Sequence, residues 1–181
     1  MTHQPFPRSS PIHEYDIFTD GSAIRDKKYQ IVGLGWAFVI FKDKVQISSG
    51  CGSLHDFTVG TNQQTELYAI EQSLIEIVDK IKPGDFDTVN IYTDSEYSKQ
   101  CVTVWYLNWI TNGWRTAKKQ PVKHKVLIEN IVDKLTALKQ DNISANVIHV
   151  KAHTDGTDYI SAGNREADRL AYQCSKSGSV V

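Results

Sequence analysis

The sequence contains no long hydrophobic run. Its apolar stretches, such as residues 37–41, are far too short to cross a bilayer, for which a helix needs about 20 apolar residues. The first thirteen residues, MTHQPFPRSSPIH, also lack the apolar core of a secretory signal. These absences predict a protein that is neither inserted in a membrane nor secreted, and we expect it in the cytoplasm.

Cysteine is scarce as well. Only three cysteines are present, Cys51, Cys101 and Cys174, and no two of them have the spacing of a metal-binding pair. Because the number is odd and a cytoplasmic location is expected, we predict free thiols, buried or half-buried, in a reducing compartment.

Proline is concentrated at the N-terminus. Residues 1–13 hold three of the five prolines, and this composition predicts a disordered tail. The last residues, 176–181, predict a second, shorter tail. No internal repeat is present, and 181 residues suffice for one hydrophobic core but not comfortably for two. The sequence therefore predicts one folded domain over residues 14–175.

A large net charge is also missing. The value of -1 at pH 7 argues against a generic nucleic-acid-binding protein. The distribution is uneven, because residues 97–128 contain six Lys or Arg and no Asp or Glu, whereas the rest of the chain has 14 basic and 21 acidic residues. Such clustering creates a local basic surface on an otherwise acidic protein.

Hydrophobic periodicity predicts an α/β domain. Runs rich in Val, Ile and aromatic residues predict strands at 15–19, 32–41, 44–52, 89–93 and 147–150. Apolar spacings of three and four predict helices from 61 to the Pro83-Gly84 pair, from about 95, at 122–138 and at 164–174. Successive strands favour an antiparallel meander, and strands separated by helices favour parallel pairing. We predict a mixed five-stranded sheet, with three antiparallel strands followed by parallel strands, flanked by helices.

Two helices have a predicted core-facing side. The residues expected on it are Leu67, Ile70, Leu74, Ile77, Val78 and Ile81 in the first helix, and Val126, Ile128, Ile131, Val132, Leu135 and Leu138 in the helix at 122–138.

Four carboxylates lie at strand ends or helix starts. Asp20 and Asp94 each follow a predicted strand, Glu66 lies in the first turns of a helix, and Asp168 lies near the start of the last helix. Ligand sites gather at the carboxyl ends of parallel strands, so the two strand-end Asp residues are candidates to converge. Grouped carboxylates bind hard divalent cations such as Mg²⁺ or Mn²⁺, and a pair of such ions promotes phosphoryl transfer.

Each carboxylate alone also has an ordinary explanation. Asp20-Gly21 is a common turn sequence, Glu66 is favoured by the dipole at a helix N-terminus, and Asp168 fits a solvated helix surface. The hypothesis of a metal site therefore depends on the combination.

The combination resembles the type 1 ribonuclease H family. The matching segments are Asp20-Gly21-Ser22, then Thr61-Asn62 followed by Glu66-Leu67, then Thr93-Asp94-Ser95, and finally Lys151, His153, Gly163-Asn164 and Ala167-Asp168. They occur in the family's order and span residues 15–172. The resemblance implies a ribonuclease H-like fold and an endonuclease that hydrolyses the RNA strand of RNA–DNA hybrids.

The resemblance also implies roles for these residues. Asp20, Glu66, Asp94 and Asp168 would hold two Mg²⁺ ions, with Mn²⁺ as a possible substitute, and Asp20 would bridge both ions. Water would be the nucleophile, and the products would carry 3′-hydroxyl and 5′-phosphate ends. His153 matches the family's mobile histidine, which assists proton transfer or product release, although a histidine in a polar loop is often only a surface residue. The expected partner is the hybrid alone, bound by a monomer that is free in the cytoplasm or associated with the nucleoid.

The stretch 105–125, which we call the basic lobe, is similar to the handle of many bacterial family members. Trp105 corresponds to the aromatic residue that packs on the DNA strand, whereas Trp109 is also a good candidate for the core. Phosphate contacts are expected from the basic side chains of the lobe. They are Arg115, Lys118, Lys119 and Lys123. The segment 110–112 departs from the family because it lacks the usual Lys and Arg.

The remaining expected substrate contacts lie near the carboxylates. Telling RNA from DNA requires reading the 2′-hydroxyl, and the resemblance assigns this to Asn62, Gln63 and Glu66, with help from the Ser22 backbone. Thr61 matches part of a DNA-phosphate pocket and is also a good helix N-cap. Asn164 completes the expected contacts. Two departures are the loop at 23–29, for which no RNA contacts carry over, and Glu96, where the family often has Gln.

Three other functions remain open at this point. A resolvase or transposase-like nuclease shares the fold and the acidic cluster but usually lacks the Asn62-Gln63 pair and the Trp-rich lobe. A non-catalytic hybrid-binding module is disfavoured by the presence of all four carboxylates. A detached retroelement domain is disfavoured by the basic lobe.

Overall fold

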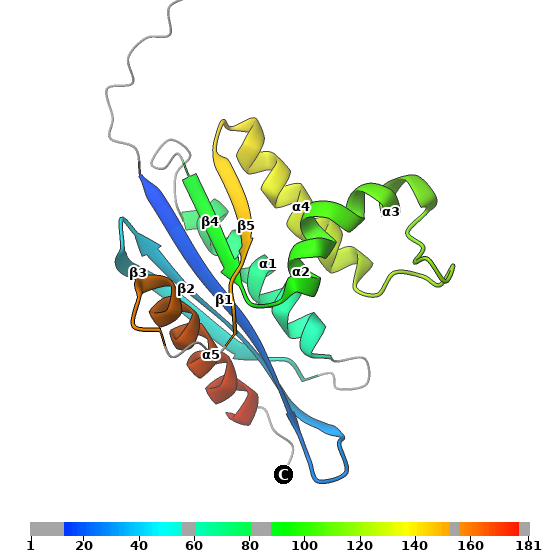
Figure 1. The fold of residues 1–181 in the computed structure, drawn as a ribbon, viewed down its shortest axis with the longest axis horizontal. Helices are drawn as coiled ribbons and strands as arrows, with labels where there is room; N and C mark the ends of the chain where they lie inside the picture. Colours follow the sequence, from blue (N-terminus) through cyan, green and yellow to red (C-terminus); the bar gives the residue numbers. More distant parts are fainter. Residues whose placement is uncertain (1–12, 56–60, 81–87, 153–155, 178–181) are drawn as a thin grey trace, which may run out of the picture.

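The computed structural model describes residues 13–55, 61–80, 88–152 and 156–177. They form a five-stranded sheet of order β3-β2-β1-β4-β5, with α1 and α4 on one face and α5 on the other (Figure 1). The elements are β1 (Glu14–Arg25), β2 (Ile31–Lys42), β3 (Val45–Ser53), α1 (Asn62–Lys80), β4 (Thr88–Thr93), α2 (Glu96–Gln100), a π-helical turn (Cys101–Trp105), α3 (Tyr106–Asn112), α4 (Lys125–Gln140), β5 (Ser144–His149) and α5 (Tyr159–Ser177).

The sheet has the predicted mixed topology. β1 to β3 pair antiparallel, whereas β4 runs parallel to both β1 and β5. Alternate residues of β1 serve opposite faces, since Tyr15 and Ile17 join the core beneath α1 and α4 while Phe18 joins the smaller core beneath α5. The predicted fold class is therefore confirmed. Most of the two predicted tails lies outside the described residues.

The predicted core faces of α1 and α4 are mostly correct. Eight of the expected residues are buried, namely Leu67, Ile70, Leu74, Ile77, Ile128, Ile131, Leu135 and Leu138, and Val132 packs partly buried against them. Val78 and Val126 are exposed instead, so their predicted burial is wrong. Val126 lies in the first turn of α4, which begins only at Lys125, on the opposite side of the helix from Ile131 and Leu135. Val78 lies one turn after Leu74, near the end of α1, and its position on the helix does not explain its exposure. Ile81 and the Pro83-Gly84 stop lie outside the described residues.

β1 is longer than predicted. The sequence suggested a strand ending at Thr19 and a turn at Asp20-Gly21-Ser22, but β1 continues to Arg25. The reason is β2, which pairs with β1 beyond this point, with Asp20 opposite Ala37 and Ser22 opposite Gly35. Glycine at position 21 is required by packing, because a Cβ there would lie 2.4 Å from the backbone nitrogen of Glu66.

The last helix also begins earlier than predicted. α5 starts at Tyr159 instead of Asn164, and the Asp158 side chain accepts a hydrogen bond from the Ser161 amide (3.0 Å) in its first turn. After α2, the chain passes through the π-helical turn into α3, which lies in the basic lobe. Gly113, with a φ of 72°, caps the C-terminus of α3. Figure 1 shows α3 and the following loop projecting beyond the edge of the sheet.

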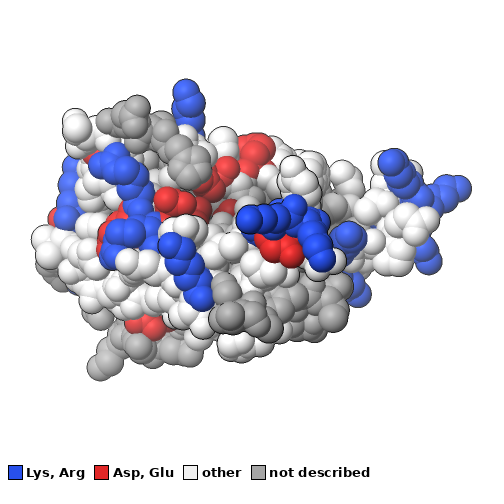
Figure 2. Space-filling model, turned by 90° about the horizontal axis from the view of Figure 1, so that it is seen from below, with Lys and Arg blue, Asp and Glu red and all other residues white. Residues whose placement is uncertain are grey.

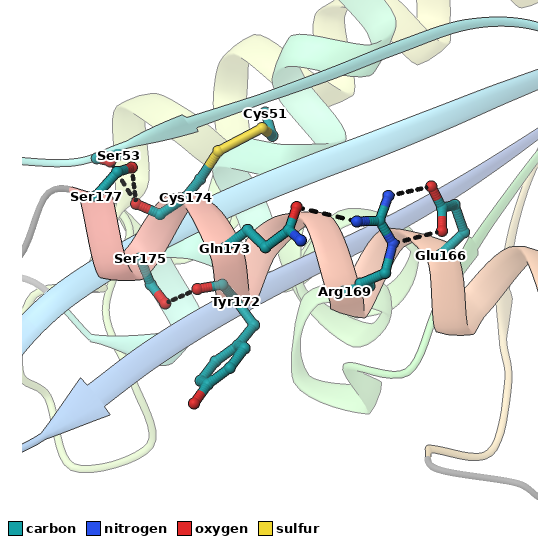
Figure 3. The surroundings of a disulfide bond; sticks show 9 residues. All are labelled: Cys51, Ser53, Glu166, Arg169, Tyr172, Gln173, Cys174, Ser175 and Ser177. Carbon is teal, nitrogen blue, oxygen red and sulfur yellow. Dashed lines mark hydrogen bonds and ion pairs between the residues drawn. A yellow bond between two sulfur atoms is a disulfide. The ribbon is translucent and has the colours of Figure 1, made fainter.

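The prediction of three free thiols is wrong for two of them. Cys51 of β3 and Cys174 of α5 form a disulfide across 123 residues of chain (Figure 3). Cys101 is free and buried. The sheet topology brings β3 and α5 together, which sequence spacing does not reveal. The Ser53 hydroxyl reinforces the link by donating to the Cys174 carbonyl (2.6 Å). Within the described residues, no helix combines the length and apolar character needed to span a bilayer.

Candidate active site

Three of the predicted carboxylates meet where β4 stops. Thr19 and Thr93 form the last residue pair between β1 and β4. Asp20 and Asp94 are the next residues after this pair and therefore lie side by side. Glu66 reaches them from the second turn of α1, which lies close over Gly21. Ligand oxygens of Asp20, Glu66 and Asp94 all lie within 4.8 Å of one another. The convergence predicted from the strand ends is therefore present in the structure.

Burial makes this group electrostatically costly. Asp20 and Glu66 are each only 4% exposed. Burial first, and then the charges of Asp94 and Asp168, raise the pKa of Asp20 to about 8. Burial followed by the charges of Asp20 and Asp94 raises the pKa of Glu66 well above its usual range. Without added positive charge, the group therefore retains protons near neutral pH.

Asp168 contributes from the opposite face of the sheet. It lies on α5, is half-buried, and is not part of the closest group of three. Its charge nevertheless acts on Asp20. The structure thus brings Asp20, Glu66 and Asp94 together beside the C-terminal end of β4, and Asp168 is near enough for its charge to act on Asp20.

The residues present fit a divalent cation. Every donor in the group is a carboxylate oxygen, the ligand type that Mg²⁺ and Mn²⁺ prefer. One oxygen of Glu66 accepts from the Asn62 amide (3.3 Å), but Oε2 is buried and has no hydrogen-bond partner among the described residues. A buried carboxylate oxygen without a donor is the arrangement that a bound cation would satisfy.

Comparison with known proteins now adds to this geometry. The RNase H family model matches residues 13–176, nearly the whole chain. The chain belongs to the ribonuclease H family. Its relatives include the ribonuclease H of Treponema denticola, which is 30% identical over 174 residues that cover 89% of this chain and 97% of that protein. The ribonuclease H of Bradyrhizobium diazoefficiens is 36% identical over 138 residues, or 76% of each chain.

Solved structures give the same result. The solution structure of the PFV RNase H domain superposes with a TM-score of 0.70 at 26% identity, covering 92% of this chain and 97% of that one. A foamy viral protease-reverse transcriptase in complex with an RNA/DNA hybrid matches with a TM-score of 0.71 at 28% identity, covering 98% of this chain and 22% of that chain.

The other predicted ribonuclease H residues near the carboxylates have mixed placements. Asn62 and Gln63 are exposed at the start of α1, beside Glu66. Thr61 caps this helix, because its hydroxyl accepts from the Gln64 amide (3.2 Å). The Ser22 hydroxyl is engaged with Ser175 of α5 (3.2 Å).

Two further predicted residues come from the C-terminal part of the sequence. Asn164 of α5 is 5% exposed, and its side-chain oxygen has no hydrogen-bond partner in the described part of the chain. His153 lies outside the described residues, so its role stays a prediction.

The basic lobe forms a separate surface with a hollow of about 800 Å³. Tyr97, Trp105, Trp109 and Trp114 form a ladder in which each ring centroid lies 5.9 Å from the next. Trp105 is 38% exposed, whereas Trp109 and Trp114 pack against the main core, as predicted for Trp109. The predicted residues that line the hollow are Gln63, Trp105, Arg115, Lys118 and Lys123.

Lys119 does not line this hollow. Its carbonyl accepts from the Arg115 guanidinium (3.0 Å), and its side chain is exposed. In Figure 2 the projecting lobe carries only basic residues among its charged side chains, whereas acidic residues gather near the middle of the same face. The charge segregation expected from the sequence is therefore visible on the surface.

Sequence reasoning missed several residues of the site. Tyr97, Asn108 and Asn112 line the hollow, and the last two follow Trp105 at helical spacings of three and seven, a signal that could have identified them. His149 contacts the backbone of Asp94 from β5. No local pattern marks that contact, because it arises from the parallel pairing of β4 and β5.

Proposed function

We propose that this protein is an endonuclease that hydrolyses the RNA strand of RNA–DNA hybrids, using two divalent ions and leaving 3′-hydroxyl and 5′-phosphate ends. The observation that carries the proposal is the close group of Asp20, Glu66 and Asp94 in a chain of the ribonuclease H family. The foamy viral relative bound to an RNA/DNA hybrid supports the choice of substrate.

Asp20, Glu66, Asp94 and Asp168 would hold the ions. Mg²⁺ ions bound there, or Mn²⁺ in their place, supply the Lewis acidity that activates water and stabilises the leaving oxygen. The protein's own contribution is to keep Asp20 and Glu66 in a buried position where their charges favour a cation. His153 would assist proton transfer or product release.

Substrate selection would fall to two surfaces. Asn62 and Gln63 are exposed beside Glu66, where their amides can hydrogen-bond the 2′-hydroxyl that distinguishes RNA. The exposed Trp105 ring and the lysines around the hollow suit the DNA strand, since flat rings stack on sugars or bases and lysines neutralise phosphates.

The decisive experiment labels one strand at a time in three matched duplexes: RNA–DNA, DNA–DNA and RNA–RNA. Each duplex is incubated with the protein in Mg²⁺ and in chelator, and the Asp20→Asn variant serves as the control for contaminating nucleases. We expect metal-dependent cutting of the RNA in the hybrid alone, with 5′-phosphate ends. Cutting of duplex DNA would instead indicate a resolvase or transposase-like enzyme, and tight hybrid binding without cutting in either ion would indicate a binding module.

A further inference from the structure

β5 extends to the turn that carries Asp94. His149, the last residue of β5, pairs with Thr93, and the amide of Val150 donates to the Thr93 carbonyl (3.0 Å). The ring of His149 continues in the same direction, with Nε2 3.1 Å from the carbonyl oxygen of Asp94. The end of β5 therefore contacts the backbone carbonyl groups of both Thr93 and Asp94.

Glu96 lies on the other side of the histidine ring. Its carboxylate is 3.4 Å from His149 Nδ1 and 4.0 Å from Lys99 Nζ, and it accepts from the Gln100 amide (2.6 Å). The side chain is not part of the close carboxylate group at Asp20. The residue that departs from the family pattern thus faces β5 and α2, where it fixes the orientation of the ring.

Asp94 has particular need of such support. Asp20 lies within β1 and Glu66 within α1, but Asp94 lies in the turn between β4 and α2. Ser95 holds the far side of this turn, since its amide donates to the Thr93 hydroxyl and its own hydroxyl caps α2. Asp94 and the carboxylates of Asp20 and Glu66 repel one another, and a turn resists such repulsion less well than a strand or a helix does.

We propose that His149, oriented by Glu96, is a positioning residue that holds the Asp94 turn in the geometry needed for divalent-ion binding. The inference rests on the proposed function, because it assumes that Asp94 binds the ion. The residue acts through the Asp94 backbone and has no contact with substrate. Partners that orient a metal ligand commonly change metal affinity by about 10–100-fold when removed.

The test measures Mn²⁺ binding by calorimetry without nucleic acid, on the wild type and four variants. His149→Ala removes the contact with the Asp94 carbonyl, whereas His149→Gln retains a donor at a similar distance along the side chain. Glu96→Gln keeps the shape of the side chain but removes its charge. His13→Ala is the matched control, because it removes a histidine that contacts a carboxylate, Asp43 (2.9 Å), at the other end of the sheet.

We expect His149→Ala to weaken Mn²⁺ binding about tenfold, Glu96→Gln to weaken it about threefold, and His149→Gln to restore most of the loss. His13→Ala should bind like the wild type. In cleavage assays, extra Mg²⁺ should recover the kcat of His149→Ala, while its KM for hybrid at saturating metal stays unchanged. A merely structural role would lower the Tm of His149→Ala and His149→Gln alike without this rescue.

The outcomes separate the two hypotheses. A wild type that binds Mn²⁺ and a His149→Ala variant that binds it equally well overturn the positioning role alone, as does a His149→Gln variant no better than His149→Ala. A wild type that binds no Mn²⁺ overturns the proposed function together with this inference. Should His149→Ala not fold, Glu96→Gln carries the same test, since it alters one half-exposed carboxylate.

Discussion

The carboxylate centre, formed by Asp20, Glu66, Asp94 and Asp168, differs from the basic lobe in the sign of its charge and in its exposure to solvent. The centre buries negative charge between β1, β4 and α1, and its Asp20 and Glu66 are almost inaccessible. The lobe projects from the sheet (Figure 1). It exposes positive charge beside an aromatic ladder. The centre therefore requires a partner of opposite charge to become stable, whereas the lobe requires only that its charges remain in water until a phosphate displaces the counterions.

This difference separates the residues expected to carry out the chemistry from the residues expected to provide affinity for the substrate. Repulsion within the centre is strong because the local dielectric is low, so each carboxylate affects the others. The exposed lysines of the lobe act nearly independently, and salt screens them. Substitutions in the centre should change kcat, and substitutions in the lobe should change KM.

The largest effect is expected from Asp20→Asn or Asp94→Asn. Each change keeps the shape of the side chain but removes a charge that the divalent ions require, so kcat should fall by about 10³-fold or more, equivalent to at least about 4 kcal/mol. Hybrid affinity, measured by fluorescence anisotropy in Ca²⁺, should stay within about threefold of the wild-type value, because most of the binding charge lies elsewhere. Retained cleavage by either variant would remove that residue from the centre.

Breaking the disulfide tests how far the stability of the folded protein depends on the link between β3 and α5, the helix that carries Asp168. In the chain-entropy account, a link across a long loop stabilises the folded state by roughly 2–4 kcal/mol, or about 4–16 °C in Tm. We expect a reductant to lower the Tm of the wild type by this amount, and Cys51→Ala to show the lowered Tm with or without reductant. If Cys51 and Cys174 were not bonded, reductant would leave the Tm of the wild type unchanged.

The charge repulsion in the centre predicts a pH dependence of stability. Because folding raises the pKa of Asp20 from 3.8 to about 8, the folded state holds a proton that the unfolded state has released between these values. Metal-free stability should therefore fall as pH rises through this window. In urea unfolding with chelator, the stabilising effect of Asp20→Asn should grow with pH between pH 5 and pH 8.5, by at most about 1.4 kcal/mol for each pH unit below the folded pKa. Equal effects at both pH values would mean that Asp20 ionises normally.

How much of this was predictable depends on whether a feature is local. The four carboxylates were identifiable because each lies in a short motif beside a predicted strand end or helix start, and the structure brings Asp20, Glu66 and Asp94 together. The strand containing Asp20 was predicted too short because its extension depends on pairing with β2. A propensity for turn at Asp20-Gly21 was overruled by a partner strand that lies next in the chain.

Non-local contacts account for the missed disulfide and for the missed contact of His149. The Cys51–Cys174 pair and the His149 contact with Asp94 each join elements far apart in the sequence, and neither has a spacing that a periodic pattern reveals. The exposure of Val126 has a local cause, since α4 begins only one residue before it, after His124 in a left-handed conformation. A helix start without a capping side chain left no signal in the sequence.

The smallest effect should come from the lobe, and it completes the comparison. Reversing two charges with Lys118→Glu/Lys119→Glu should raise KM for the hybrid about tenfold at low salt, leave kcat unchanged, and flatten the salt dependence of KM, because fewer counterions are released on binding. The control is Lys42→Glu/Lys44→Glu, which reverses two lysines flanking the β2–β3 turn at the far end of the sheet from Asp20. Net charge changes equally in the two variants, so a similar rise of KM in the control would show that general charge, and not the lobe, attracts the substrate. A rise confined to the lobe variant, vanishing at high salt, would place affinity there and leave chemistry to the centre.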